Sequence, residues 1–246
     1  MKYAASIVVF IIGLAWAEET DPARLLNELS AANKAKDAGK IDTLLKAIGE
    51  VGKSSKDQKT VDALAKELGL ALKTCKGNWG TLRRIADTLG ELQSKNTVKV
   101  LKRYAYQKKA KDENQESVQV HALLAVGKMA DPKQIDSIGD QCKQRKLPVA
   151  KAAYEAFKHY GIASGKVRKR CAELLMKRLE AEYPSSGGQG GGTVSKEAQE
   201  RWQQLADVIV ASMQSICREP TINDVDNWRE WWKENKKRSQ VWKDKA

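Results

Sequence analysis

Apolar residues recur at intervals of three and four positions through most of the chain, which is the spacing of one face of an α-helix. No segment shows convincing alternation of apolar and polar residues with a period of two, so strands are not expected. The pattern therefore predicts an all-α protein. Examples of the stripes are Ile41, Leu44, Leu45, Ile48 and Val51; Leu82, Ile85, Ala86, Leu89 and Leu92; and Val167, Cys171, Leu174, Leu175 and Leu179.

A short phrase with a central glycine returns along these stripes. It occupies residues 48–51, 89–92 and 126–129, with starts 41 and 37 residues apart, and a looser copy begins 31 residues later at Phe157. Helical repeats with a period near 40 residues are typical of an α-solenoid. Glycine inside a helix costs ~1 kcal/mol relative to alanine. The recurring glycine is therefore predicted to allow a neighbouring helix to approach closely.

Turn and cap residues divide the chain further. Asp21-Pro22 is expected to begin the first helix, and Gly39 and Gly52 to end the first two helical segments. Asp131-Pro132 predicts a turn between two paired helices. Ser195, and either Asp224 or Asp226, are candidate N-caps near the C-terminus.

The three phrases at 48–51, 89–92 and 126–129, together with the Asp131-Pro132 turn, resemble the HEAT-repeat family within the armadillo-like α-solenoids. The resemblance covers residues 40–180 and is one of fold. It implies a HEAT-like α-solenoid of stacked antiparallel helix pairs over residues 21–183. It also implies a protein-binding role and supplies no catalytic residues.

The first residues have the order of a secretory signal peptide. Lys2 precedes the apolar run 4–15, Ala15-Trp16-Ala17 has the small-x-small form of a cleavage site, and an acidic stretch follows. The alternative is a membrane anchor, but the run is shorter than the ~20 residues needed to cross a bilayer. Residues 1–17 are therefore expected to be removed, leaving an exported protein, periplasmic or secreted, that begins at Glu18. No other segment is apolar enough to be an integral membrane segment.

The region 184–195 is rich in glycine and serine and is predicted to be a flexible linker. A C-terminal helical cap is expected to follow over residues 196–240. Within it, Trp228, Trp231 and Trp232 share one helical face. This ending resembles the tryptophan-rich ending of some exported bacterial HEAT-repeat proteins. The tryptophans either cap the last repeat or form an aromatic platform for a glycan or partner, and the cap is favoured because terminal repeats need one.

Charge suggests a candidate binding surface. The chain carries 44 Lys and Arg against 31 Asp and Glu, a formal net charge of +13. Such an excess favours an anionic neighbour. The HEAT resemblance implies that the second helix of each pair lines the concave side of the array. The basic clusters on these helices either merge into one concave groove or form an ordinary solvated face. The candidate residues are Lys99, Lys102, Arg103, Lys166, Arg168, Lys169 and Arg170.

Cysteine and histidine give no catalytic or metal pattern. Cys75, Cys142, Cys171 and Cys217 contain no C-x-x-C pair, so no zinc site is expected. Four buried free thiols are favoured over a Cys142–Cys171 disulfide. His121 and His159 have no acidic or cysteine cluster beside them, and no cofactor motif or catalytic constellation is recognised.

These observations lead to one principal interpretation and two alternatives. The principal one is an exported, non-enzymatic scaffold that mediates protein–protein interaction. The first alternative is binding of an anionic polymer, an acidic polysaccharide or nucleic acid, through the basic groove. The second is an enzyme similar in fold to the alkylpurine DNA glycosylases, which the export signal and the absence of a recognisable catalytic site disfavour.

Overall fold

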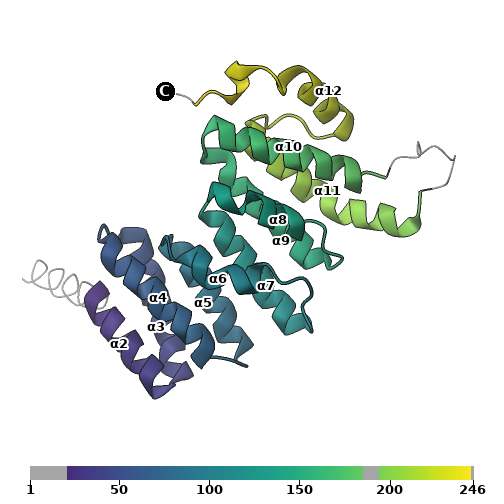
Figure 1. Ribbon diagram of the computed structural model, residues 1–246. Coiled ribbons are helices and arrows are strands. Elements are labelled where there is room, and N and C mark those ends of the chain that lie inside the picture. The colour runs from purple at the N-terminus through teal and green to yellow at the C-terminus, as the bar shows by residue number, and fades with distance from the viewer. Residues whose placement is uncertain (1–20, 185–193, 245–246) are drawn as a thin grey trace, which may run out of the picture. The chain divides into compact units, whose positions relative to one another are not determined.

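A computed structural model describes residues 21–184 and 194–244 (Figure 1). Over these residues the chain is helical and contains no strand, so the all-α prediction is confirmed. The predicted signal peptide and most of the predicted linker lie outside the described residues. The chain divides into two compact units, residues 1–103 and 104–246. Both flanks of the predicted linker belong to the second unit.

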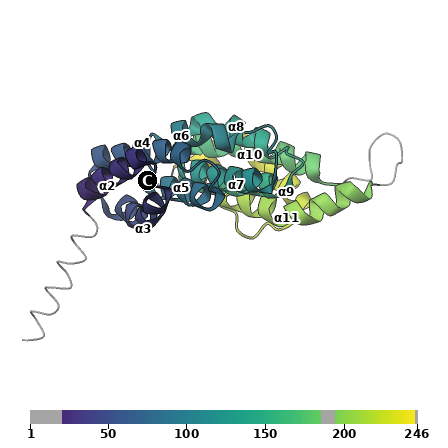
Figure 2. The same cartoon turned by 90° about the horizontal axis from the view of Figure 1, so that it is seen from below.

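The first unit contains two layers of helices. α3 packs beside α5 in one layer, and α2 packs against α3 and α4 (Figure 2). Leucine, isoleucine, valine and alanine fill the space between them. The helices are α2 (Pro22–Ala35), α3 (Ala38–Ser54), α4 (Gln58–Thr74) and α5 (Trp79–Leu92). α6 (Thr97–Ala105) begins in this unit, and its last two residues belong to the second.

The second unit also packs alternate helices side by side. α7, α9 and α11 form one layer, while α8 and α10 cover α9 and α11 (Figure 2). The α-helices are α7 (Glu113–Lys128), α8 (Ile135–Gln141), α9 (Leu147–Lys158), α10 (Gly165–Glu182), α11 (Lys196–Cys217) and α12 (Val225–Asn235). Short 3₁₀ turns are η1 (Pro132–Gln134), η2 (His159–Ile162) and η3 (Ser239–Trp242).

Side-chain caps set most helix starts. The carboxylate of Asp21 accepts from the Ala23 backbone N–H at 3.0 Å, with Pro22 opening α2. Ser195 and Asp224 also act as N-caps, as predicted. Asp131, where the sequence predicted a turn, caps the short 3₁₀ helix η1. Two predicted helix ends were wrong, because α2 ends at Ala35 through a left-handed Lys36, and both Gly39 and Gly52 lie inside α3.

The predicted close approach of a neighbouring helix occurs at the repeated glycine of the third phrase. In the first phrase it occurs at a different glycine. A Cβ on Gly127 would lie 2.6 Å from the Cα of Ala156, so α7 and α9 touch backbone to backbone there. In the first phrase, Gly49 faces only the flexible carboxylate of Glu91. The close backbone approach lies one turn later, where a Cβ on Gly52 would be 2.6 Å from the Cα of Leu92 on α5.

All four cysteines are buried, and each is a free thiol in the structure, as the favoured interpretation predicts. Burial raises the pKa of the Cys171 thiol to about 12, and it raises the pKa of Cys142 and Cys217 as well. The thiolate is the reactive form. These side chains therefore act as small apolar core residues.

The glycine contacts predict opposite outcomes for two matched substitutions. We expect Gly127→Ala to lower the free energy of unfolding by about 1–3 kcal/mol, because the added methyl group forces two backbones apart. Gly49→Ala should leave stability unchanged or raise it by up to ~1 kcal/mol, because Glu91 can move away and alanine favours the helix. Urea unfolding of both variants measures the difference. Equal effects would contradict the backbone contact at Gly127.

The thiols yield a second prediction. A chromogenic thiol reagent at pH 8 should leave the native protein unmodified and should titrate four thiols in denaturant without reductant. Detection of only two thiols in denaturant would indicate a disulfide and contradict the structure.

Candidate functional site

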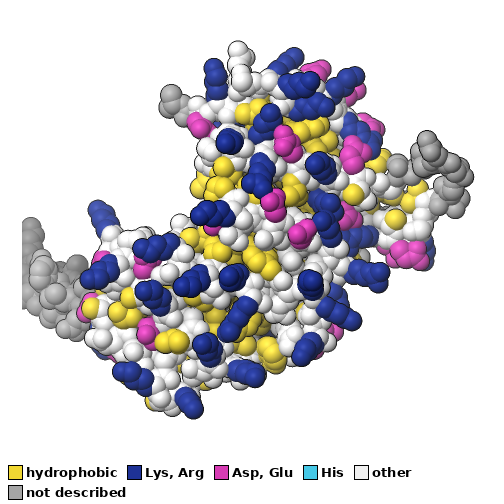
Figure 3. Space-filling model, in the orientation of Figure 1, with side chains coloured by type: hydrophobic (Ala, Val, Ile, Leu, Met, Phe, Trp, Pro, Cys, Tyr) yellow, Lys and Arg dark blue, Asp and Glu magenta, His cyan; other side chains and the backbone are white. Residues whose placement is uncertain are grey.

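A stripe of lysines runs along α4. Lys59, Lys66 and Lys73 are exposed and lie seven residues apart, which is close to two helical turns, so all three share one face. On α6 the exposed cations are Lys99, Lys102 and Arg103, which the sequence predicted. We call these six residues the α4–α6 basic face. Figure 3 shows Lys and Arg side chains gathered over these two helices.

The turn before α6 holds the two helices together. Asp62 on α4 accepts a hydrogen bond from the Ser94 hydroxyl at 2.7 Å and pairs with Lys95 at 2.9 Å. Burial alone raises the pKa of Asp62, but the hydrogen bonds from Ser94, Lys95 and Gln58 outweigh it, and the pKa is lowered. A Cβ on Gly69 of α4 would lie 3.0 Å from the Val100 side chain of α6. The basic residues therefore stand on two fixed, adjacent helices.

The basic face carries unbalanced charge and one apolar residue. Among the described residues, no carboxylate forms an ion pair with Lys66, Lys73, Lys99 or Lys102. Leu70 lies four residues after Lys66 and three before Lys73, and 48% of its surface is exposed. A large apolar side chain between lysines can bury itself against an apolar group on a partner.

The cations at the start of α10 behave differently from one another. Lys166 and Arg170 are exposed and Lys169 is half-buried, and Arg170 pairs with Asp136 of α8. Arg168 was wrongly placed on the binding surface, because its side chain is fully buried. These four residues lie in the second unit and the α6 cations in the first, so each group is described by itself.

Arg168 instead anchors the C-terminal segment. Its guanidinium donates to the backbone oxygens of Ile216 at 3.2 Å and Lys243 at 3.4 Å, and lies 5.8 Å from the centre of the Trp242 ring. The carboxylate of Asp244 accepts from the Gly165 N–H at 2.7 Å at the start of α10. Residues 242–244 therefore pack over the first turn of this helix.

The three predicted cap tryptophans lie beside this closure. Trp228 is fully buried and meets Trp231 edge to face, with ring centres 5.6 Å apart. Trp231 and Trp232 each contact Trp242 in the same geometry, at 6.0 and 6.2 Å. Edge-to-face packing is a favourable aromatic geometry. The burial of Trp228 fits the cap interpretation and removes that side chain from any exposed platform.

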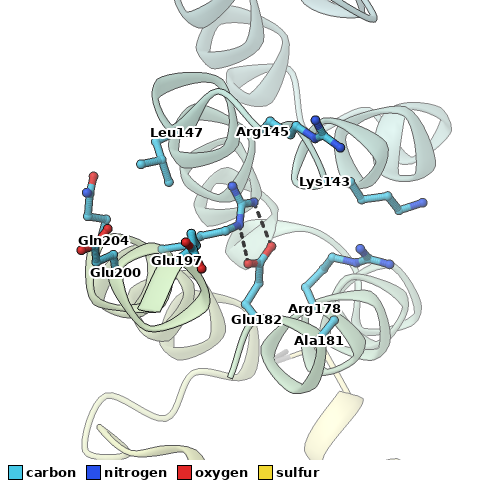
Figure 4. A pocket seen from close by; sticks show the side chains of 10 residues that line it. Lys143, Arg145, Leu147, Arg178, Ala181, Glu182, Glu197, Glu200 and Gln204 are labelled. Carbon is cyan, nitrogen blue, oxygen red and sulfur yellow. Dashed lines mark hydrogen bonds and ion pairs between the residues drawn. The ribbon is translucent and has the colours of Figure 1, made fainter. Parts of the chain in front are cut away.

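A polar pocket of about 530 Å³ lies between the α8–α9 loop, the end of α10 and the start of α11 (Figure 4). Two of its lining residues, Arg201 and Glu182, form a two-pronged ion pair, at 2.7 and 3.0 Å. Arg201 also donates to the backbone oxygens of Gln144 and Cys142. The hydrogen bond to Glu182 is the main cause of the raised pKa of Arg201. The pair joins three chain segments, so its role is structural.

The described residues contain no cluster of three or more His, Cys, Asp or Glu side chains with metal-binding geometry. None of the helices in residues 21–184 and 194–244 combines the length and apolar character that a membrane crossing requires.

The lysines of α4 were not among the residues predicted from the sequence to bind a partner, although their seven-residue spacing indicates a shared helical face. Neither a family model nor a curated protein matches this sequence.

The ion pair between Arg201 and Glu182 predicts a large loss of stability when one partner is removed. Arg201 and Glu182 side chains are 24% and 11% exposed. Arg201→Ala should therefore lower the free energy of unfolding by about 3–5 kcal/mol, because it leaves a buried carboxylate unpaired. Glu200→Gln, which alters the exposed pair with Lys196, is the control and should change stability by less than ~1 kcal/mol. Chemical denaturation measures both, and a small effect of Arg201→Ala would contradict the structural role.

The C-terminal closure yields a fourth prediction. Truncation after Pro220 should expose α10 and cause aggregation, measured by light scattering. Gly165→Ala should detach the same segment without deleting it, because the new Cβ would lie 1.4 Å from the Trp242 carbonyl oxygen. Limited proteolysis should then cut residues 221–244 faster. The control Gly80→Ala has no atom nearer than 3.8 Å and should digest like the unaltered protein. A stable, monomeric truncated protein would contradict the cap.

Proposed function

We propose that this protein is an exported, non-enzymatic HEAT-like scaffold that binds an acidic segment of a partner protein through the α4–α6 basic face. The observation that carries the proposal is Leu70, exposed between Lys66 and Lys73. A partner with carboxylates around an apolar residue complements both features of this face. Charge steers the encounter, and apolar burial adds stability to the complex.

Three features support the HEAT-like solenoid. The repeated phrases have a period near 40 residues, and alternate helices pack side by side within each unit. The backbone contact at Gly127 gives the repeated glycine a packing reason. Export is supported by the signal-peptide pattern of residues 1–17.

The alternative is an anionic polymer, favoured by the net charge of +13 and by the unpaired lysines. A polysaccharide or nucleic acid would contact the cations and would gain little from Leu70. Its affinity would fall steeply with salt, because binding releases counterions. The role of Leu70 therefore separates the two partners.

The test compares three probes by fluorescence anisotropy at low and moderate salt. The first is an acidic peptide with leucines among glutamates, the second an oligoglutamate of equal charge, and the third heparin. We expect the leucine-containing peptide to bind more tightly than oligoglutamate and to keep more of its affinity in salt. Leu70→Ser should weaken it about fivefold or more, and Lys66→Glu with Lys73→Glu should weaken it further.

Matched controls lie on other surfaces. Ile162 is the other large apolar residue exposed in the described chain, at 88%, and Ile162→Ser should not alter binding. Lys46→Glu changes an exposed lysine on α3 and should have a much smaller effect than the double change on α4. Tight heparin binding with no effect of Leu70→Ser would favour the polymer and contradict the protein partner.

A further inference from the structure

A second pocket in the second unit is lined by acidic side chains, in contrast to the α4–α6 basic face. It has a volume of about 500 Å³ and lies between one face of α11, the start of α12 and Tyr183. Asp207, Asp224 and Asp226 line it, and no lysine or arginine does. A locally anionic pocket in a chain of net charge +13 is not explained by the proposed basic face.

The wall on α11 has the form of a groove. Trp202, Ala206, Val210 and Gln214 follow one another at intervals of four, so they lie along one side of the helix. The small Ala206 lies between larger side chains and leaves depth. From Trp202 to Gln214 the helix rises about 18 Å, the length of five or six extended residues. The groove therefore accommodates a short peptide segment.

The aromatic end of the groove is built from Trp202 and Tyr183. Their rings meet edge to face with centres 5.2 Å apart. Trp202 is partly exposed, so part of its ring lines the pocket. An indole face attracts a cation, and a guanidinium also stacks on it.

The protein already binds one guanidinium at this corner. The Arg229 guanidinium lies 5.0 Å from the centre of the Tyr183 ring and donates to Asp226 at 2.7 Å. Arg229 also donates two hydrogen bonds to Glu180, and this hydrogen bonding lowers the pKa of the Glu180 carboxyl. An aromatic ring beside an aspartate is thus an arginine site within this structure.

Carboxylate capacity remains for a second cation. Asp224 accepts from the backbone N–H and side-chain amide of Asn227 as N-cap of α12, and Asp226 accepts from Arg229 through one oxygen. Asp207 forms no ion pair or hydrogen bond with any described residue. A carboxylate can accept about four hydrogen bonds, so acceptors on all three remain available.

We infer that this groove binds an arginine-bearing peptide segment of a partner protein, with the guanidinium stacked on Trp202 and paired with Asp207. The three aspartates favour a cationic occupant over a neutral saccharide, because their charges are complementary to it. Arginine is favoured over lysine, because the flat guanidinium can stack on the aromatic ring and pair with the carboxylate at the same time. The site is separate from the α4–α6 basic face and does not depend on its function.

The test follows the indole N–H resonance of Trp202 by NMR in the full chain, assigned with the Trp202→Leu variant. The probes are a capped Gly-Arg-Gly-Arg-Gly peptide, its lysine counterpart and its citrulline counterpart, which keeps the shape of arginine without charge. We expect the arginine peptide to shift the Trp202 resonance saturably. The lysine peptide should bind at least about threefold more weakly than the arginine peptide, and the citrulline peptide should leave the resonance unchanged.

Asp207→Asn should weaken the arginine peptide about fivefold without altering the thermal midpoint, because Asp207 is exposed and has no partner to lose. Trp202→Leu should weaken it more, measured by calorimetry. Glu234→Gln, an exposed acid on α12 outside the groove, is the control and should have no effect.

Three outcomes would overturn the inference. Equal binding of arginine and citrulline peptides would show that charge is not recognised. A saturable shift with a neutral oligosaccharide but not with arginine would assign the groove to a glycan. Concentration-dependent self-association lost in Asp207→Asn would assign it to a second copy of this chain.

Discussion

Backbone contact between alternate helices is the constraint on which the packing of each unit depends. At Gly127 and Gly52 a Cβ would lie 2.6 Å from the partner backbone, so α7 meets α9, and α3 meets α5, too closely for any larger side chain at these positions. Interaxial distance follows from the side chains at the contact. Once these helices are fixed, the helices of the second layer have one buried side and one free side. The lysine stripe on α4 occupies such a free side, and Asp62 fixes α4 to the turn before α6.

The second unit ends in a closure that uses a buried charge. Arg168 has backbone carbonyl oxygens as its hydrogen-bond acceptors and the Trp242 ring beside it. A buried guanidinium is costly unless its donors are satisfied. The backbone oxygens of residues 216 and 243 accept from its two terminal nitrogens, so one of these two hydrogen bonds forms only when the C-terminal segment is in place. The third nitrogen, Nε, has no hydrogen-bond partner among the described residues. The same segment brings Trp242 against Trp231 and Trp232, which joins the polar anchor to the aromatic cluster.

The helical class and the helix starts at Asp21, Ser195 and Asp224 could be predicted from the sequence, because period and caps are local properties. The errors come from tertiary context. Arg168 was grouped with its basic neighbours, yet it lies three, four and seven residues before Cys171, Ala172 and Leu175, which places it on the buried stripe of α10. That spacing was readable. In contrast, nothing local distinguishes Gly49, which faces a flexible side chain, from Gly52, which faces a backbone, since the difference lies in α5. The groove beside Trp202 was equally hidden, because three separate segments build it.

Net charge describes this chain poorly as a guide to its partners. The excess of cations comes from residues such as Lys66, Lys73, Lys99 and Lys102, whose charge no described carboxylate neutralises by ion pairing. Elsewhere the local charge is negative. Asp207, Asp224 and Asp226 line one groove, and no lysine or arginine lines it. At physiological ionic strength, charges more than about 8 Å apart in solvent are largely screened. A partner therefore responds to the local composition of the surface that it touches. A protein that is basic as a whole can for this reason attract an acidic segment at one surface and a basic segment at another.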